Sequence, residues 1–111
     1  MILAKSLADS FMECWKVKYI YQTKRPDMTD KSIDLAMANP PFPSYTSGHS
    51  TISFTASGIL TELVPEKKQV WEKHATDAKN SRLWAGIHFP YDNDEGQKLG
   101  EEVARNILEN L

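Results

Sequence analysis

A turn of small residues, Ser47-Gly48-His49, stands directly before an apolar helical pattern. Ser47 has the residue type and the position of a helix N-cap. The N–H groups that follow it lack partners within the helix, and the positive end of the helix dipole lies there, so the turn is suited to bind an anion. Gly48 lets an anion approach the backbone closely. His49 adds a titratable group beside it.

Three cations, Lys18, Arg25 and Arg82, lie on or beside apolar helical faces. Burying an unpaired cation costs on the order of several kcal/mol, and only Glu13 and Asp27 are carboxylates near them in sequence. A bound dianion or trianion would balance them, because arginine offers forked donors and lysine a point charge to oxyanions. With the turn and two histidines, they predict a pocket for phosphate or an analogue. The alternative for Lys18 is a lysine whose stem packs along an apolar face while its amine reaches water.

Four helices must position these residues. Helical periodicity predicts them over residues 2–24, 49–63, 66–85 and 93–110, with a short helical turn in 30–37. The expected inward stripe of the first helix is Leu3, Leu7, Phe11, Cys14 or Trp15, Lys18 and Tyr21. The expected inward residues of the last are Leu99, Val103, Ile107 and Leu111, with Asp92 or Asn93 as its N-cap. No strand pattern competes, so we expect an all-α, compact helical bundle of about four main helices.

Composition limits the class of protein. The 111 residues, with 41% hydrophobic and 25% charged residues, predict a single domain over 1–111. A net charge of −2 gives no reason to expect a nucleic-acid partner. The lone Cys14 allows no intrachain disulfide. No signal-peptide layout and no membrane-spanning run is visible, so we expect a soluble protein whose compartment is unknown. The helical pattern starts at once, which predicts that upstream helices are missing or supplied by a second copy in a homodimer.

Three groups of residues have the order and spacing of a three-part motif. The parts are Lys18 with Arg25-Pro26, then Ser47-Gly48-His49, then Ser81-Arg82 with His88 and Asp92. Together they resemble the superfamily of type 2 phosphatidic acid phosphatases, bacterial class A acid phosphatases and vanadium-dependent haloperoxidases. The resemblance covers residues 18–92, with Thr46 where the family usually has proline. It implies that the bundle is the core of the acid phosphatase/vanadium haloperoxidase fold.

The resemblance also implies a role for each matched residue. The residues that would hold the oxyanion are Lys18, Arg25, Arg82, Ser47 and Gly48 through its N–H. His88 would be the covalent partner, either as a nucleophile that forms a phosphohistidine or as the ligand of vanadate. His49 would be the acid–base group. Asp92 would orient a histidine or an arginine, or cap the last helix, and the sequence leaves these roles open.

The same pocket would serve two reactions. As a haloperoxidase it would hold vanadate on His88 as its cofactor and oxidise a halide with hydrogen peroxide, with Lys18 and His49 also catalytic. As a phosphatase it would need no cofactor and would hydrolyse a phosphomonoester through His88. Trp15 and Phe42 look like the aromatic pair on the halide side of chloroperoxidases, which favours the first reaction. The alternative is that both rings pack inside the bundle.

A non-catalytic phosphate-binding domain is the third candidate. The chain is shorter than is usual for the family, and an open pocket would not exclude water. In all three cases the expected partner is a small oxyanion rather than a nucleic acid or a membrane.

Overall fold

The computed structural model describes residues 1–111 and is helical, without a strand. Its elements are α1 (Ile2–Tyr21), α2 (Pro26–Thr29), α3 (Gly48–Leu63), the 3-10 turn η1 (Pro65–Lys67), α4 (Lys68–Trp84) and α5 (Pro90–Glu109). The four long helices confirm the predicted all-α bundle. No helix has both the length and the apolar character needed to cross a membrane.

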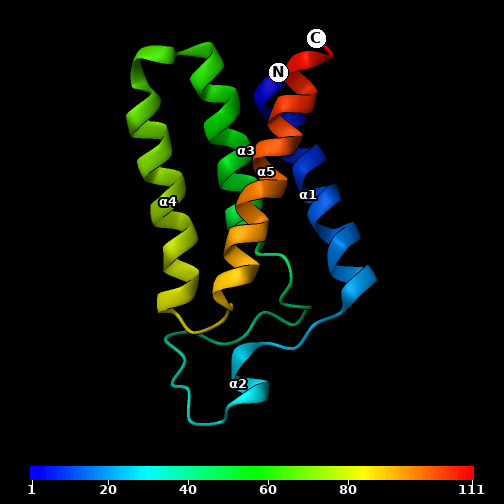
Figure 1. The fold of residues 1–111 in the computed structure, drawn as a ribbon, viewed down its shortest axis with the longest axis vertical. Helices are drawn as coiled ribbons and strands as arrows, with labels where there is room; N and C mark the ends of the chain where they lie inside the picture. The colour runs from blue at the N-terminus through cyan, green and yellow to red at the C-terminus, as the bar shows by residue number, and fades with distance from the viewer.

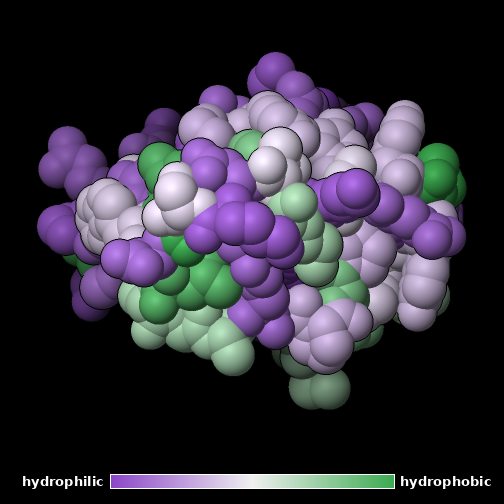
Figure 2. Space-filling view, turned by 90° about the horizontal axis from the view of Figure 1, so that it is seen from below, coloured by the Kyte–Doolittle hydropathy of each residue, from purple (hydrophilic) through white to green (hydrophobic).

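Helix α3 is the centre of the bundle and packs against α5, α4 and α1. Figure 1 shows both termini at one end, and α2 with the long loop between α2 and α3 at the other. That lower end therefore collects the end of α1, the start of α3, the end of α4 and the start of α5. Seen from this end, the surface mixes hydrophilic side chains with smaller groups of hydrophobic ones (Figure 2). Every predicted site residue lies in a connection at this end or within about two turns of these helix ends.

The first two helices differ from the prediction in their bounds. Helix α1 ends at Tyr21 rather than near residue 24, because Gln22 takes a left-handed conformation (φ 47°) and its N–H bonds the carbonyl of Lys18. The helical turn predicted in 30–37 is wrong, since the short helix is α2, upstream of it. Pro26 occupies the first position of α2, where its missing N–H leaves no helical bond unmade.

Helix α5 begins at Pro90, earlier than the predicted residue 93, because proline at the first helical position leaves no helical hydrogen bond unmade. Its N-cap is Phe89, so the prediction that Asp92 or Asn93 is the N-cap is wrong. Asp92 lies in the first turn, where its carboxylate accepts the N–H of Phe89 at 2.9 Å. Leu111, predicted to face inward, is 82% exposed because it follows the end of α5.

The face of α1 that packs into the bundle agrees with the predicted stripe at Cys14 and Lys18, but two serines are buried in its first half. The buried residues, one every four positions, are Ser6, Ser10, Cys14 and Lys18. The Ser6 and Ser10 hydroxyls donate to carbonyls of their own helix at 2.7 and 2.8 Å, so burial leaves them satisfied. Phe11 and Tyr21, by contrast, are 50% and 63% exposed. Small side chains let α1 approach α3, and the larger ones fall at the edge of the contact.

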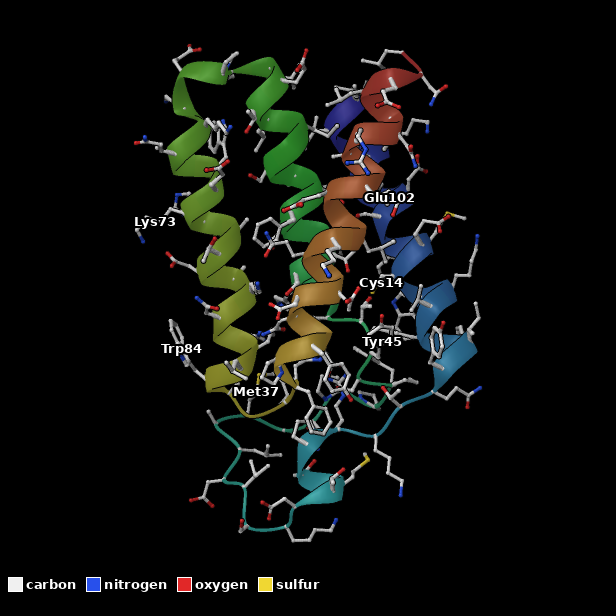
Figure 3. All side chains as sticks on the ribbon, in the orientation of Figure 1. Cys14, Met37, Tyr45, Lys73, Trp84 and Glu102 are labelled. Carbon is white, nitrogen blue, oxygen red and sulfur yellow. The ribbon has the colours of Figure 1, made fainter.

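Helix α4 presents several side chains to solvent on its outer side. Lys73 and Trp84 point away from the bundle in Figure 3, and 72% of Trp84 is exposed. Tyr45 lies instead at the lower end, where its ring centroid is 6.1 Å from that of Tyr91 at the start of α5.

Two glycines bring α5 against the start of α3. A Cβ on Gly96 would lie 2.8 Å from the carbonyl oxygen of Ser47, and one on Gly100 would overlap the carbonyl oxygen of Thr51. The Thr55 hydroxyl donates to the carbonyl of Gly100 at 3.0 Å across the same contact. This close approach fixes how the Ser47 turn sits relative to the first turn of α5.

We predict that Gly100→Ala destabilises the protein by about 1–3 kcal/mol or more, because the added methyl has no room against the backbone of α3. The matched control is Gly48→Ala, since a Cβ there meets nothing within 4 Å. Thermal unfolding of both variants is the measurement. Equal melting temperatures for the two variants would show that α5 does not depend on this approach.

Candidate functional site

The Ser47 turn has the geometry that its residue types predict. The Ser47 side chain accepts the N–H of Ser50 at 3.2 Å, which confirms its place as the N-cap of α3. The first intrahelical bond runs from the Thr51 N–H to the Ser47 carbonyl at 3.0 Å, so the N–H groups of Gly48 and His49 precede the helical ladder. The Ser47 N–H donates to the carbonyl of Asp92 at 3.0 Å and ties the turn to α5.

Lys18 and Arg25 are buried cations whose hydrogen-bond partners are mainly backbone carbonyls. Only 1% of Lys18 and 0% of Arg25 is exposed. Lys18 Nζ donates to the carbonyl of Pro43 at 2.7 Å. Arg25 donates to the carbonyls of Phe42 (Nε, 3.1 Å) and Ile87 (Nη1, 2.9 Å). Both cations also lie 5.2 Å from the centre of the Phe42 ring, and neither forms a salt bridge with a carboxylate.

The charges of these two residues oppose each other. Burial lowers the pKa of Lys18 to about 8, and the charge of Arg25 acts in the same direction. Burial also lowers the pKa of Arg25. Lys18 is therefore still protonated at pH 7 but loses its proton in mildly alkaline solution. Two like charges without a paired carboxylate are an arrangement that a bound oxyanion would stabilise.

His88 lies against Arg25 and has one defined tautomer. Its Nε2 is 3.1 Å from Arg25 Nη1, and because a guanidinium only donates, Nε2 must carry the lone pair. Nδ1 then carries the proton and faces Asp92 Oδ2 at 3.2 Å. Burial lowers the pKa of His88, and the hydrogen bond to Asp92 opposes this only in part. At pH 7 the ring is thus neutral, with a lone pair on the nitrogen beside the cations.

Asp92 has two of the roles that the sequence left open: it orients a histidine and it bonds the start of the last helix. It holds the Nδ1 side of His88, and it accepts the N–H of Phe89 at the start of α5. Burial alone would raise the pKa of Asp92, but hydrogen bonds from His88, Ser44 and the Phe89 N–H outweigh burial and lower it. Asp92 makes no hydrogen bond with an arginine side chain.

Ser44 is a site residue that sequence reasoning missed. It is fully buried, its hydroxyl donates to Asp92 Oδ2, and its oxygen lies 3.3 Å from His88 Nδ1. It therefore contacts both members of the pair that orients the histidine ring. No periodicity marks Ser44, because it lies in the irregular loop before α3. The only signal was its place in the proline-rich approach to the Ser47 turn.

His49 and Arg82 lie at the rim of the arrangement. Partial burial lowers the pKa of His49, and the charge of Arg82 acts in the same direction. Arg82 donates to the hydroxyl of Ser81 at 3.0 Å and to the sulfur of Met37 at 3.5 Å. It makes no hydrogen bond to Lys18 or to the other predicted oxyanion-binding side chains.

The predicted aromatic wall, Trp15 with Phe42, forms one side of a pocket of about 340 Å³. The two ring centroids are 4.8 Å apart with the planes at 59°. The predicted site residues that line the pocket are Trp15, Lys18, Phe42, Gly48 and His49. Those that do not line it are Arg25, Ser47, Arg82, His88 and Asp92. A larger pocket of about 670 Å³ lies beside the two chain termini, and no predicted site residue lines it.

Comparisons with known proteins agree with this geometry. Residues 62–111 match the family model described as the VCPO second helical-bundle domain. The structure is similar to the crystal structure of the first bacterial vanadium-dependent iodoperoxidase, with a TM-score of 0.90 and 29% identity over 99% of this chain and 32% of that chain. This chain thus spans about a third of the length of that protein. No curated protein matches the sequence.

A second similar structure is a transmembrane PAP2 type phosphatidylglycerolphosphate phosphatase from Bacillus subtilis. The TM-score is 0.75 with 18% identity, over 97% of this chain and 56% of that chain, which is a likeness of fold. The family model, the iodoperoxidase and the phosphatase fold all agree with the three-part motif. These findings match the superfamily that the three-part motif resembles, which unites vanadium-dependent haloperoxidases with type 2 phosphatidic acid phosphatases.

Proposed function

We propose that this chain carries the oxyanion site of a vanadium-dependent haloperoxidase, which oxidises a halide with hydrogen peroxide. The observation that supports this best is an aromatic wall placed directly beside a cationic oxyanion site. Trp15 and Phe42 line the same pocket as Lys18, and the Lys18 ammonium lies over the Phe42 ring. A weakly hydrated halide is suited to such a surface, whereas the phosphate group of a phosphomonoester gains little from it.

The donor set is suited to vanadate. Lys18, Arg25 and the Gly48 N–H would be donors to the oxygens of vanadate. His88 Nε2, whose lone pair accepts the Arg25 Nη1–H in this structure, would hold the vanadium. The Ser47 hydroxyl proton is also available, because its oxygen is the part that accepts the Ser50 N–H. Vanadate, when bound at His88, would supply the activation of hydrogen peroxide toward the halide. Arg82 would add a donor from the side of α4.

The chain's own residues have separate tasks in this proposal. Lys18 and Arg25 stabilise the negative charge on the oxyanion's oxygens. His49 is neutral near pH 7, because partial burial and the charge of Arg82 lower its pKa, so a ring nitrogen can accept a proton from the incoming peroxide. Asp92 keeps the proton of His88 on Nδ1 and so keeps the lone pair on Nε2.

Phosphomonoester hydrolysis is the second candidate, and the orientation of His88 supports it. A neutral ring with its Nε2 lone pair beside two cations is also a nucleophile for phosphorus. In that reaction the phosphorus–oxygen ester bond breaks as a bond from Nε2 to phosphorus forms. The leaving oxygen takes its proton from the imidazolium form of His49, which the lowered pKa makes available only in acidic solution. Water activated by His49 then releases phosphate from His88.

Halide oxidation is the direct test. We expect the purified protein, loaded with orthovanadate, to halogenate a diketone reporter in the presence of hydrogen peroxide and iodide or bromide. A vanadate-free sample should be inactive, and saturating phosphate should suppress turnover because both anions would share one site. If vanadate raises the melting temperature but no halide is oxidised, the haloperoxidase proposal fails, and 4-nitrophenyl phosphate becomes the substrate to assay.

Lys18→Met should raise the melting temperature at pH 7 while removing the stabilisation by vanadate. The substitution removes a buried charge, and the Pro43 carbonyl keeps a hydrogen bond from Arg25 Nη2 at 3.4 Å. Since the pKa of Lys18 is about 8 in the folded protein and ordinarily 10.5, its destabilising effect is complete below pH 8 and declines as the pH rises further. The gain in the variant should therefore shrink between pH 8 and 10.

Thermal unfolding with and without vanadate across this pH range is the measurement. Lys16→Met is the matched control, because Lys16 is an exposed lysine on the same helix with only a surface ion pair to Glu13. A variant Lys18→Met that still gains stability from vanadate would show that Lys18 is no part of the site.

Ser44→Ala should lower the kcat of halide oxidation by the vanadate-loaded protein roughly tenfold, with little change in KM. The reason is that Asp92 loses a buried charge-assisted hydrogen bond and orients His88 less well. Nitrogen NMR of the His88 ring should show a mixture of tautomers in the variant, a change that mere destabilisation would not give. Ser57→Ala, at another buried serine, is the control. An unchanged tautomer together with unchanged kcat would contradict the assignment.

A further inference from the structure

The pocket beside the oxyanion site is larger than the proposed reaction of a halide requires. Its volume is about 340 Å³, whereas one water molecule occupies roughly 30 Å³ in the liquid. A halide or hydrogen peroxide would fill a small part of it. The volume lies instead near the lower end of the range of about 300–1,000 Å³ that is typical of sites for small organic ligands.

The lining of the pocket selects one kind of chemistry. Besides Trp15 and Phe42, it includes Phe11 and Ile52, which belong neither to the oxyanion donors nor to the predicted aromatic wall. Phe11 stands 5.9 Å from Trp15 between ring centroids, so three rings follow one another along the wall. Flat aromatic surfaces of this kind favour a planar, aromatic ligand.

The polar side of the pocket favours a ligand that carries a hydrogen-bonding oxygen. Lys18, Gly48 and His49 line it together with the aromatic rings. No carboxylate does, so the lining offers no anionic partner to a cation. An oxygen substituent on an aromatic ring could receive a hydrogen bond from Lys18 or His49 while the ring packs against Phe11 and Trp15.

We propose that this pocket binds the aromatic ring of an aryl–oxygen compound, with its oxygen toward Lys18 and His49. The inference rests on the proposed function and names the class of its organic substrate. A phenol that accepts the halogen and the aryl group of a phosphomonoester present the same ring and oxygen. Phe11 and Ile52 are then specificity-determining residues, and the oxyanion site remains as described.

Binding of 1-naphthol, a neutral phenol, tests the pocket without turnover. In methyl NMR of isoleucine-labelled protein, 1-naphthol should shift the Ile52 resonance and leave Ile107, beside the chain termini, unchanged. Inorganic phosphate, titrated separately, reports on the oxyanion site. If phosphate binds and 1-naphthol does not, this inference is wrong while the proposed function stands. If phosphate and vanadate both fail to bind, the proposed function itself fails.

The variant Phe11→Ala should weaken 1-naphthol binding about two- to tenfold and leave phosphate affinity unchanged, because it removes one aromatic contact and no oxyanion donor. Phe11 is half exposed, so the fold should tolerate the change. Met12→Ala is the matched control, since Met12 is an exposed apolar side chain at the next position of α1 and does not line the pocket. Equal affinities in the two variants would overturn the assignment.

Steady-state kinetics distinguish whether the aromatic ring belongs to a phosphomonoester or to a phenol. Phe11→Ala should raise KM two- to tenfold for 1-naphthyl phosphate if the protein hydrolyses it, and for 1-naphthol if the vanadate-loaded protein halogenates it. The KM for glycerol phosphate, or for the halide, should not change. A rise that is the same for aromatic and non-aromatic substrates would contradict a ring-binding role.

Discussion

The arrangement of the site depends on two cations held against the carbonyls of one loop. Lys18 and Arg25 come from the end of α1 and the segment after it, and their donors meet the carbonyls of Phe42, Pro43 and Ser44. Arg25 also donates to the carbonyl of Ile87, so one guanidinium joins three separate stretches of the chain. Carbonyl oxygens satisfy the donors but do not neutralise the charges, and the lowered pKa of Lys18 reflects that difference.

A second constraint sets the distance between the turn and the histidine. Because Gly96 and Gly100 have no Cβ, the backbone of α5 approaches that of α3 at Ser47 and Thr51. Asp92, one turn before Gly96, then accepts from Phe89 and His88 while its carbonyl receives the Ser47 N–H. The turn, the carboxylate and the histidine ring are thus held by one helix–helix contact, and a loop alone would not position them so closely.

The sequence was most informative where local chemistry decides the structure. The Ser47 N-cap, the four helices and the burial of Lys18 could all be predicted from residue type and spacing. The first half of the buried face of α1 could not, because Ser6 and Ser10 look like solvent-exposed residues until their hydroxyls are seen to bond their own helix. Ser44 was missed for a related reason, since an irregular loop has no periodicity that would separate its inward from its outward side chains.

The position of Phe42 limits which residues of the site can be substituted independently. One ring packs against Trp15 in the pocket and also lies under both buried cations. A replacement at Phe42 would therefore alter the organic pocket and the oxyanion site at once, and selection on either would resist it. Phe11 is half exposed, and its ring packs beside Trp15 without lying against either buried cation. Changes in substrate preference should therefore arise more readily by substitution on the exposed face of α1 around Phe11 than in the loop that carries Phe42.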